Sequence, residues 1–270
     1  MTILQDYSIP DAPLTELGLA QCKQLQEDLR RDLPLADEID LIVVSPLRRT
    51  LQTAQGGLGW LIERGVPVEL HAEWQENSDK PCDTGTAVET IQPHFPTLSF
   101  ATVDPAFPAK TGHYTFSQTA ILHRGETCRA WLRARPEKVI AVVSHSGFLR
   151  VGVSNAAYAN ADYRVFDFAK EDDVEAAAEA NPGNRLIEWE LTREKGGGRG
   201  QSPKGWFGPE SQPWPTTDTT THLAPASAPV PVPVPVPVPA VPTVELNGVA
   251  HVPDDVPKQT AEEVTPEVPN

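Results

Sequence analysis

Residues 42–54 constrain the fold of this chain more than any other stretch. They begin as a run of branched apolar residues, the composition of a strand that is buried on both faces. The chain then turns at Ser45 and Pro46 and continues in residues that favour a helix. Arg48 and Arg49 therefore follow the C-terminal end of a predicted parallel strand, where open α/β sheets bind ligands and a helix N-terminus favours anions. An ordinary strand-to-helix junction with solvated arginines would have the same sequence, so this stretch alone leaves both interpretations open.

A second stretch repeats this layout and carries a histidine. Residues 139–143 are apolar and predict another buried strand, which Ser144, His145 and a small-residue turn follow. Because parallel strands place their C-terminal ends along one edge of a sheet, we expect His145 and Arg49 to converge on one anion. A lone histidine is more often structural than catalytic. The two strand ends together indicate an anion site more specifically than either does alone.

The motifs in these stretches are Ser-Pro-Leu-Arg-Arg-Thr-Leu-Gln-Thr-Ala at 45–54 and Val-Val-Ser-His-Ser-Gly-Phe-Leu-Arg at 142–150. Together they resemble two signatures of the histidine phosphatase superfamily, in its phosphoglycerate-mutase-like branch. Pro-Leu-Thr-Glu-Leu-Gly at 13–18 is similar to the start of the family's first helix. Residues 74–77 and 81–85 resemble the segment that holds the acidic residue in fungal members. The resemblance covers residues 6–192.

The resemblance implies a fold and a reaction. The family fold is a three-layer α/β/α sandwich with a mainly parallel sheet, and the complete family hydrolyses phosphomonoesters through a phosphohistidine. The implied partner is a small phosphorylated substrate, and neither a cofactor nor a metal is implied. A phosphatase is expected rather than a mutase, because nothing in the sequence indicates a pocket that holds and returns the phosphoryl group.

The same resemblance implies roles for individual residues. Arg49 is the expected phosphate clamp, and Arg48 is expected at the surface. A guanidinium suits the task because its planar fork donates two charge-assisted hydrogen bonds to a phosphoryl group. His145 is the expected second catalytic histidine, which binds the phosphoryl group and stabilises charge during transfer.

A general acid for the leaving group is expected in residues 73–76, which contain two carboxylates. Partial burial near Trp74 would raise the pKa of a carboxyl group toward the range that a general acid needs. The resemblance identifies Glu76 as the catalytic acid. From the residues alone Glu73 and Glu76 cannot be separated, and a solvated acidic pair is an equal alternative. Residues 77–120 are irregular and are expected to form a lid or substrate loop.

The chain departs from the family at one motif. Members open with a strand that ends in Arg-His-Gly, whose histidine becomes phosphorylated, and these 270 residues contain no Arg-His-Gly. We therefore assign no nucleophile and expect a fold that lacks its usual first central strand. We expect that strand to lie between the two strands identified above, so that its loss leaves two inner edges unpaired. Each buried unsatisfied group costs about 1–3 kcal/mol against a total stability of about 5–15 kcal/mol, so such a loss is hard to survive.

Three hypotheses follow for the function. The first is a phosphatase or mutase of which this chain is an incomplete product, with activity that is impaired or absent. It predicts an upstream reading frame that encodes an apolar strand ending in Arg-His-Gly. The second is a catalytically dead pseudoenzyme that binds phosphate esters. The third is an interaction protein that uses a Pro-rich tail.

The last part of the chain differs in composition from the rest. The glycines at 196–198 predict the end of the globular part, so we expect a domain at residues 1–195 and a disordered, acidic, Pro-rich tail at residues 196–270. Val-Pro repeats at 230–239 favour an extended, polyproline-like state. We interpret them as an inert spacer in preference to a ligand for a polyproline-binding partner.

Charge and cysteine content restrict partners and location. The net charge of -15 argues against binding to nucleic acid, which needs a basic face, but it permits a local basic pocket. Three cysteines without a Cys-x-x-Cys pair suit a reducing compartment. No apolar run is long enough for a membrane span and no signal peptide opens the chain, so a cytoplasmic location is expected, with the nucleus as the alternative.

Local signals predict the remaining elements. Thr15 is expected to cap a helix that ends before Pro34. The glycines at 56, 57 and 59 are expected to bend or break the helix that follows Pro46. Residues 186–191 predict a final edge strand.

Overall fold

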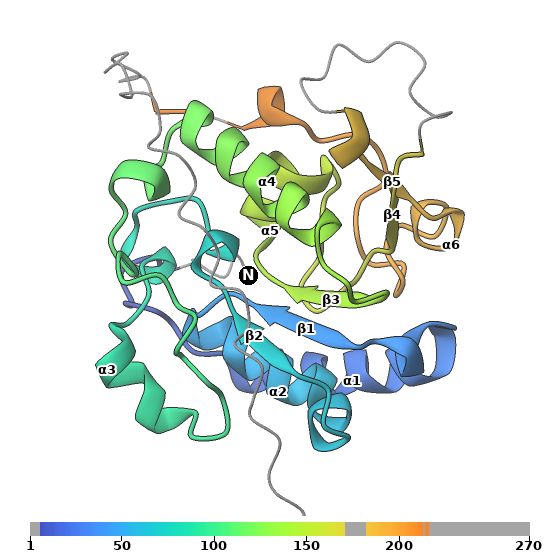
Figure 1. The fold of residues 1–270 in the computed structure, drawn as a ribbon, viewed down its shortest axis with the longest axis horizontal. Helices are drawn as coiled ribbons and strands as arrows, with labels where there is room; N and C mark the ends of the chain where they lie inside the picture. The colour runs from blue at the N-terminus through green and yellow to red at the C-terminus, as the bar shows by residue number, and fades with distance from the viewer. Residues whose placement is uncertain (1–5, 171–181, 213, 216–270) are drawn as a thin grey trace, which may run out of the picture. The chain divides into compact units, whose positions relative to one another are not determined.

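The computed structural model describes residues 6–170, 182–212 and 214–215. In this part of the chain a parallel, three-stranded sheet lies between two layers of helices (Figure 1). β1 (Leu41–Val44) is the central strand, with β2 (Val68–Leu70) on one side and β3 (Ile140–Val143) on the other. The predicted α/β/α sandwich with a mainly parallel sheet is confirmed.

The direct pairing of β1 with β3 overturns one prediction. The two strands are in register from Leu41 opposite Ile140 to Val44 opposite Val143. No strand separates them, so the usual first central strand is lacking, as expected, and the gap that we expected in its place is wrong. The two unpaired inner edges are wrong as well, because each strand supplies hydrogen-bond partners for the other.

The two helix layers bury opposite faces of β1. Their main helices are α1 (Glu16–Asp32) and α2 (Arg48–Glu63) on one face, and α4 (Gln118–Arg133) and α5 (Ser146–Phe148) on the other (Figure 1). Successive side chains of a strand point to opposite faces. Ile42 and Val44 therefore join the core against α1 and α2, whereas Leu41 and Val43 join the core against α4 and α5. β1 is buried along its whole length, but all four side chains of β3 are only half-buried.

α2 is one continuous helix, so the break that was one of the two outcomes expected at its glycines does not occur. A Cβ atom at Gly56 would lie 2.9 Å from the Cβ of Cys22, and one at Gly57 would lie 3.0 Å from the Cδ2 of Leu25. Both neighbours belong to α1. The glycines therefore let the two helices pack closely, and this packing offsets their low helix propensity.

Shorter elements complete the described fold. The predicted cap of α1 is confirmed, because the Oγ1 of Thr15 accepts a hydrogen bond from the Gly18 N–H at 3.2 Å. The remaining helical pieces are α3 (Val88–Ile91), a π-helical turn at Leu149–Ser154, and 3₁₀ turns at Ala36–Glu38, Ala72–Trp74, Pro81–Asp83, Gln92–His94, Gly112–Tyr114, Pro182–Asn184 and Pro209–Ser211.

A separate two-stranded sheet follows the main one in the chain. β4 (Phe166–Phe168) pairs antiparallel with β5 (Leu186–Glu188), and β4 was not predicted. The strand predicted at 186–191 is only partly right, because α6 (Glu190–Arg193) begins within that stretch.

Packing continues beyond the triple glycine at 196–198. The Gly198 N–H donates to the carbonyl oxygen of Tyr163 at 2.7 Å, and the Nε of Arg199 donates to the Oδ2 of Asp28 at 2.7 Å. The boundary predicted at residue 195 therefore falls inside the packed part of the chain. The Val-Pro repeats at 230–239 lie outside the described residues. Within the described ranges, no helix has both the length and the apolar character that crossing a membrane requires.

Candidate functional site

His145 follows β3 and meets the residue that follows β1. Its Nε2 and the Oγ of Ser45 share a hydrogen bond of 2.8 Å, and both side chains are buried. Burial lowers the pKa of His145 well below its ordinary value. The positive charges of Arg49, Lys110 and Arg124 act in the same direction. His145 is therefore a neutral imidazole at neutral pH.

Arg49 lies in the first turn of α2, three residues after the Pro46 turn that ends β1. Its Nη1 donates to the carbonyl oxygen of Cys82 at 2.6 Å, and its Nη2 pairs with the Oδ1 of Asp83 at 2.9 Å. Among the described residues, its Nε has no acceptor. The structure thus brings Arg49 and His145 to the same edge of the sheet, where the sequence predicted that they meet.

Asp11 fixes the start of α2 and was not predicted as part of the site. Its side chain is only 2% exposed, and its Oδ1 accepts from the Arg48 N–H at 2.9 Å. Its Oδ2 accepts from the Thr86 N–H at 3.0 Å, so one carboxylate joins α2 to the loop that holds Asp83. A carboxylate at a helix N-terminus also interacts favourably with the helix dipole. The side chain of Arg48 itself makes no hydrogen bond or ion pair within the described part of the chain.

The structure separates the two carboxylates that the sequence left as alternatives. Glu76 lies against the turn after His145, where its oxygens accept from the N–H groups of Gly147 at 3.2 Å and Phe148 at 2.9 Å. Glu73 instead pairs with the Nε2 of His113 at 2.6 Å. These two backbone N–H groups therefore hold the carboxylate of Glu76.

Two cations of the site were missed by the sequence analysis. Lys110 donates from Nζ to the carbonyl oxygen of Glu76 at 2.6 Å. Arg124, on α4, is 1% exposed, donates from Nη2 to the Oδ1 of Asn77 at 3.1 Å, and lies 4.1 Å above the ring of Phe148. A lysine in an irregular segment has no sequence feature that would identify it as a site residue. Arg124 had one, because it lies on the helix face that carries the buried apolar residues, where a charge is unexpected.

Unpartnered buried polar atoms gather next to these residues. Among the described residues, no hydrogen-bond partner exists for Trp74 Nε1, both amide atoms of Gln75, Asn77 Nδ2 and Arg124 Nε. In the described part of the chain, the other such side-chain atom is Trp60 Nε1, on α2. Buried polar groups are usually paired, so this concentration distinguishes residues 74–77 and Arg124 from the rest of the described core. No group of three or more His, Cys, Asp or Glu residues that suits a metal occurs among the described residues.

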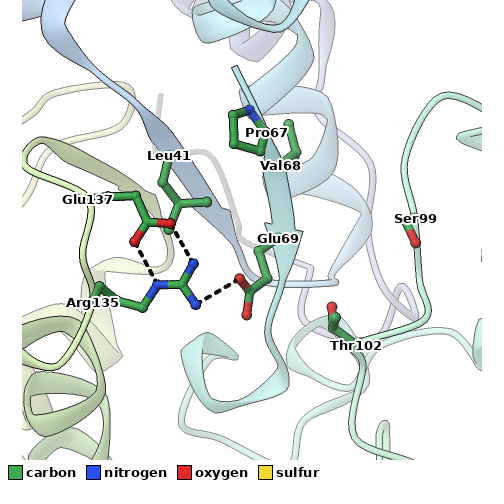
Figure 2. A pocket seen from close by; sticks show the side chains of 8 residues that line it. All are labelled: Leu41, Pro67, Val68, Glu69, Ser99, Thr102, Arg135 and Glu137. Atoms are coloured by element: carbon green, nitrogen blue, oxygen red, sulfur yellow. Dashed lines mark hydrogen bonds and ion pairs between the residues drawn. The ribbon is translucent and has the colours of Figure 1, made fainter. Parts of the chain in front are cut away.

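A pocket of about 300 Å³ lies away from this site (Figure 2). Its lining includes Leu41 and Val68, the first residues of β1 and β2, whereas the candidate site follows the last residues of β1 and β3. Arg135 is held there between Glu69, at 3.5 Å, and Glu137, at 2.7 Å (Figure 2). Its cation is already paired, and no predicted site residue lines the pocket.

Comparisons with known proteins agree with the motifs. The model of the histidine phosphatase superfamily (branch 1) matches residues 6–170. A protein of Schizosaccharomyces pombe named "probable phosphatase" is 33% identical over 145 residues, which are 52% of this chain and 65% of that protein. A phosphoglycerate mutase-like protein of Arabidopsis thaliana is 30% identical over 176 residues, with coverage of 54% and 62%. Mycobacterial hydrolase 1, a solved structure, is 19% identical over 67% of this chain and 89% of its own, with a TM-score of 0.40. The chain spans less than two thirds of the length of the two curated relatives.

Proposed function

Because the chain belongs to branch 1 of the histidine phosphatase superfamily, we propose that its site binds small phosphate monoesters through Arg49 and His145. The observation that carries the proposal is the hydrogen bond between Ser45 and His145, which joins the ends of β1 and β3 beside Arg49. A phosphoryl group between these side chains would receive charge-assisted hydrogen bonds from the guanidinium. The neutral imidazole would bind it without adding a second fixed charge.

Glu76 is the proposed proton donor to the leaving group. Its contacts with Gly147 and Phe148 keep it beside His145, within the site that the phosphoryl group would occupy. To reach a leaving-group oxygen, the side chain must exchange at least one of these hydrogen bonds for the substrate. Such an exchange is inexpensive where the substrate's own oxygens become the new acceptors for the backbone N–H groups.

Turnover by these 270 residues is proposed to be impaired or absent. The sequence contains no Arg-His-Gly, the motif whose histidine receives the phosphoryl group in the complete family. Binding and proton donation use residues that are present, whereas phosphoryl transfer needs a nucleophile that we do not assign. The alternative within the same class is a pseudoenzyme, in which phosphate-ester binding is itself the function.

Calorimetric titration of the 270-residue protein with inorganic phosphate tests the binding site. We expect R49M to weaken binding by about tenfold or more, which corresponds to ~1.4 kcal/mol. R48M is the matched control, because it removes the neighbouring guanidinium and leaves the Arg48 N–H to Asp11 intact, and it should change the affinity by less than about twofold. Equal effects of R48M and R49M, or no phosphate binding by the wild type, would overturn the proposal.

Hydrolysis of p-nitrophenyl phosphate tests the second half of the proposal. The wild-type chain is expected to show no turnover beyond that of its H145Q variant. Turnover that H145Q abolishes would show an active phosphatase and would remove the statement on impaired activity, while leaving the binding site in place.

A second candidate function rests on the Val-Pro repeats at 230–239, which suit a partner domain with an aromatic groove for polyproline segments. Deletion of residues 216–270 should then abolish capture of such a domain. The deletion begins after residue 215 because residues 196–202 pack into the fold. Capture that survives the deletion would dispose of this candidate. For both candidates we propose a cytoplasmic or nuclear location, which the free thiols of Cys22, Cys82 and Cys128 support.

A further inference from the structure

Lys110 belongs to residues 77–120, the segment that the sequence predicted to be a lid or substrate loop, and it reaches the site from there. Its Nζ donates a hydrogen bond of 2.6 Å to the carbonyl oxygen of Glu76. The carboxylate of the same residue accepts from Gly147 and Phe148, which closely follow His145 in the chain. Glu76 therefore links the Lys110 ammonium to the turn that carries His145.

The charges around this ammonium leave a positive surplus. Burial lowers the pKa of Lys110 to about 7, and the positive charges of Arg124 and Arg49 act in the same direction. The negative charges of Glu76 and Asp83 oppose them. Because Coulomb interactions weaken with distance, all four groups lie in the neighbourhood of Nζ. With the ammonium protonated, three positive charges face two negative ones, and this surplus favours a bound anion.

A purely structural role explains Lys110 less well. Lysines that serve stability usually pair with a carboxylate or extend their charge into water. Lys110 is half-buried, and among the described residues its ammonium forms no ion pair and one hydrogen bond. An ammonium has three N–H donors, so two remain for an acceptor that the described protein groups do not provide. A phosphoryl group would provide it.

We propose that Lys110 is a substrate-binding residue, whose ammonium contacts the phosphoryl oxygens that Arg49 and His145 also bind. The inference rests on the proposed function, because it requires a phosphoryl group in this site. The segment at 77–120 then takes a direct part in substrate binding, because Lys110 belongs to it.

Binding should then be coupled to protonation of Lys110. With a pKa of about 7, the free amine is partly deprotonated at neutral pH, and a bound anion favours the ammonium form. Anion affinity should therefore fall as the pH rises above 7. The other charged and titratable groups that face Lys110 are Arg49 from α2, Arg124 from α4, His145 after β3, and the carboxylates of Glu76 and Asp83.

The first experiment measures the affinity of the 270-residue protein for inorganic phosphate at about pH 6.5, where Lys110 is charged. We expect K110M to weaken binding by about tenfold and K110R to stay within about threefold. K80M is the matched control, because Lys80 belongs to the same segment but is exposed, with its Nζ 4.0 Å above the ring of Tyr7. It should bind phosphate like the wild type.

The outcomes separate this inference from the proposed function. If K110M binds phosphate like the wild type while R49M does not, Lys110 is not a substrate-binding residue and the phosphate site stands. If neither the wild type nor K110R binds phosphate, the proposed function fails together with the inference. If K80M weakens binding as much as K110M does, the effect is one of overall charge, and the inference is overturned.

A second experiment does not depend on the folding of K110M. It follows sulfate binding from about pH 6.5 to about pH 8.5, because the charge of sulfate is constant over this range. The wild-type affinity should fall by about tenfold, and that of K110R by less than about twofold, because a guanidinium does not titrate there. Parallel profiles for the two proteins would contradict the inference.

Discussion

The two faces of the sheet treat buried polar groups differently. On the α1/α2 face, both carboxylate oxygens of Asp11 accept backbone hydrogen bonds, and the Oγ1 of Thr50 donates to the carbonyl oxygen of Ser45. On the α4/α5 face, Arg124 and Asn77 share one hydrogen bond but each keeps a buried nitrogen without a partner. An unpaired buried group costs about 1–3 kcal/mol, so the second face carries a cost that the first avoids.

This difference indicates that the two faces contribute to different properties of the protein, one to stability and the other to binding. The α1/α2 face is satisfied by the protein alone, with Trp60 Nε1 as its exception among the described residues. The α4/α5 face has cations and amides that a ligand can pair, next to His145 and Glu76. We infer that, apart from Arg49 at the start of α2, changes on the first face mainly alter the free energy of unfolding, whereas polar changes on the second mainly alter anion binding.

The largest expected effect compares one added methyl group on each face. A Cβ at Gly125 of α4 would overlap the carbonyl group of Gly152, whereas one at Gly59 of α2 meets no atom within 4 Å. We expect G125A to lower the free energy of unfolding by about 3 kcal/mol, because neither backbone can yield cheaply. G59A should raise it by about 0.5–1 kcal/mol. Urea denaturation measures both, and a tolerated G125A would mean that the α4/α5 face is loosely packed.

The second prediction compares the removal of a charge that is fully hydrogen-bonded with the removal of one that is not. D11A removes the acceptor of two partly buried backbone N–H groups, from Arg48 and Thr86, and should cost about 2 kcal/mol of stability. R124M removes a buried cation that forms no ion pair with the described residues, so stability should change by less than about 1 kcal/mol. Phosphate affinity should fall in R124M, because the site loses positive charge. Denaturant midpoints measure the stability of both variants, and titration measures their phosphate affinity. If R124M unfolds the protein while D11A does not, the inferred difference between the two faces is wrong.

The sequence predicted those parts of the site that local patterns encode. Apolar runs followed by turns identify the strands before Ser45 and His145, and parallel pairing then brings Arg49 to the same edge. Strand order is not local, so the direct neighbourhood of β1 and β3 could not be derived. The continuity of α2 depends on Cys22 and Leu25 of α1, which no property of the glycines themselves reveals.

The missed residues have a common physical reason. Asp11, Lys110 and Arg124 act through contacts between segments far apart in the chain, such as the hydrogen bond between Lys110 and Glu76, which are 34 positions apart. Single polar residues in loops and helices are usually solvated, so their sequence context favours the wrong interpretation. The roles of Arg49, Glu76 and His145 stay predictions, because geometry alone brings them together without assigning their chemistry.

The third prediction concerns pH. The pKa of His145 is lowered by burial, so the unfolded chain binds more protons than the folded one below about pH 6.5. Stability should be full above that pH and fall as the pH decreases, by at most about 1.4 kcal/mol per pH unit from this group. H145Q should have a shallower pH dependence, measured by urea denaturation between about pH 5 and about pH 7.5. H94Q is the control, since His94 is exposed, and its profile should match the wild type. Identical slopes for H145Q and the wild type would mean that His145 is not buried neutral in solution.

The smallest expected effect tests whether the contrast between the faces extends to the helix ends. Thr15 caps α1 and Ser117 caps α4, and each side-chain oxygen accepts from the backbone N–H three residues on, at 3.2 Å. T15A and S117A should each cost about 1 kcal/mol, because each leaves one N–H of the first turn without its acceptor. Phosphate affinity should be unchanged in both, which titration of the same samples checks. A loss in S117A that clearly exceeds the loss in T15A would place extra strain at the start of α4. In that case the unsatisfied groups of this face would reflect poor packing of the whole helix, and a ligand would not be needed to explain them.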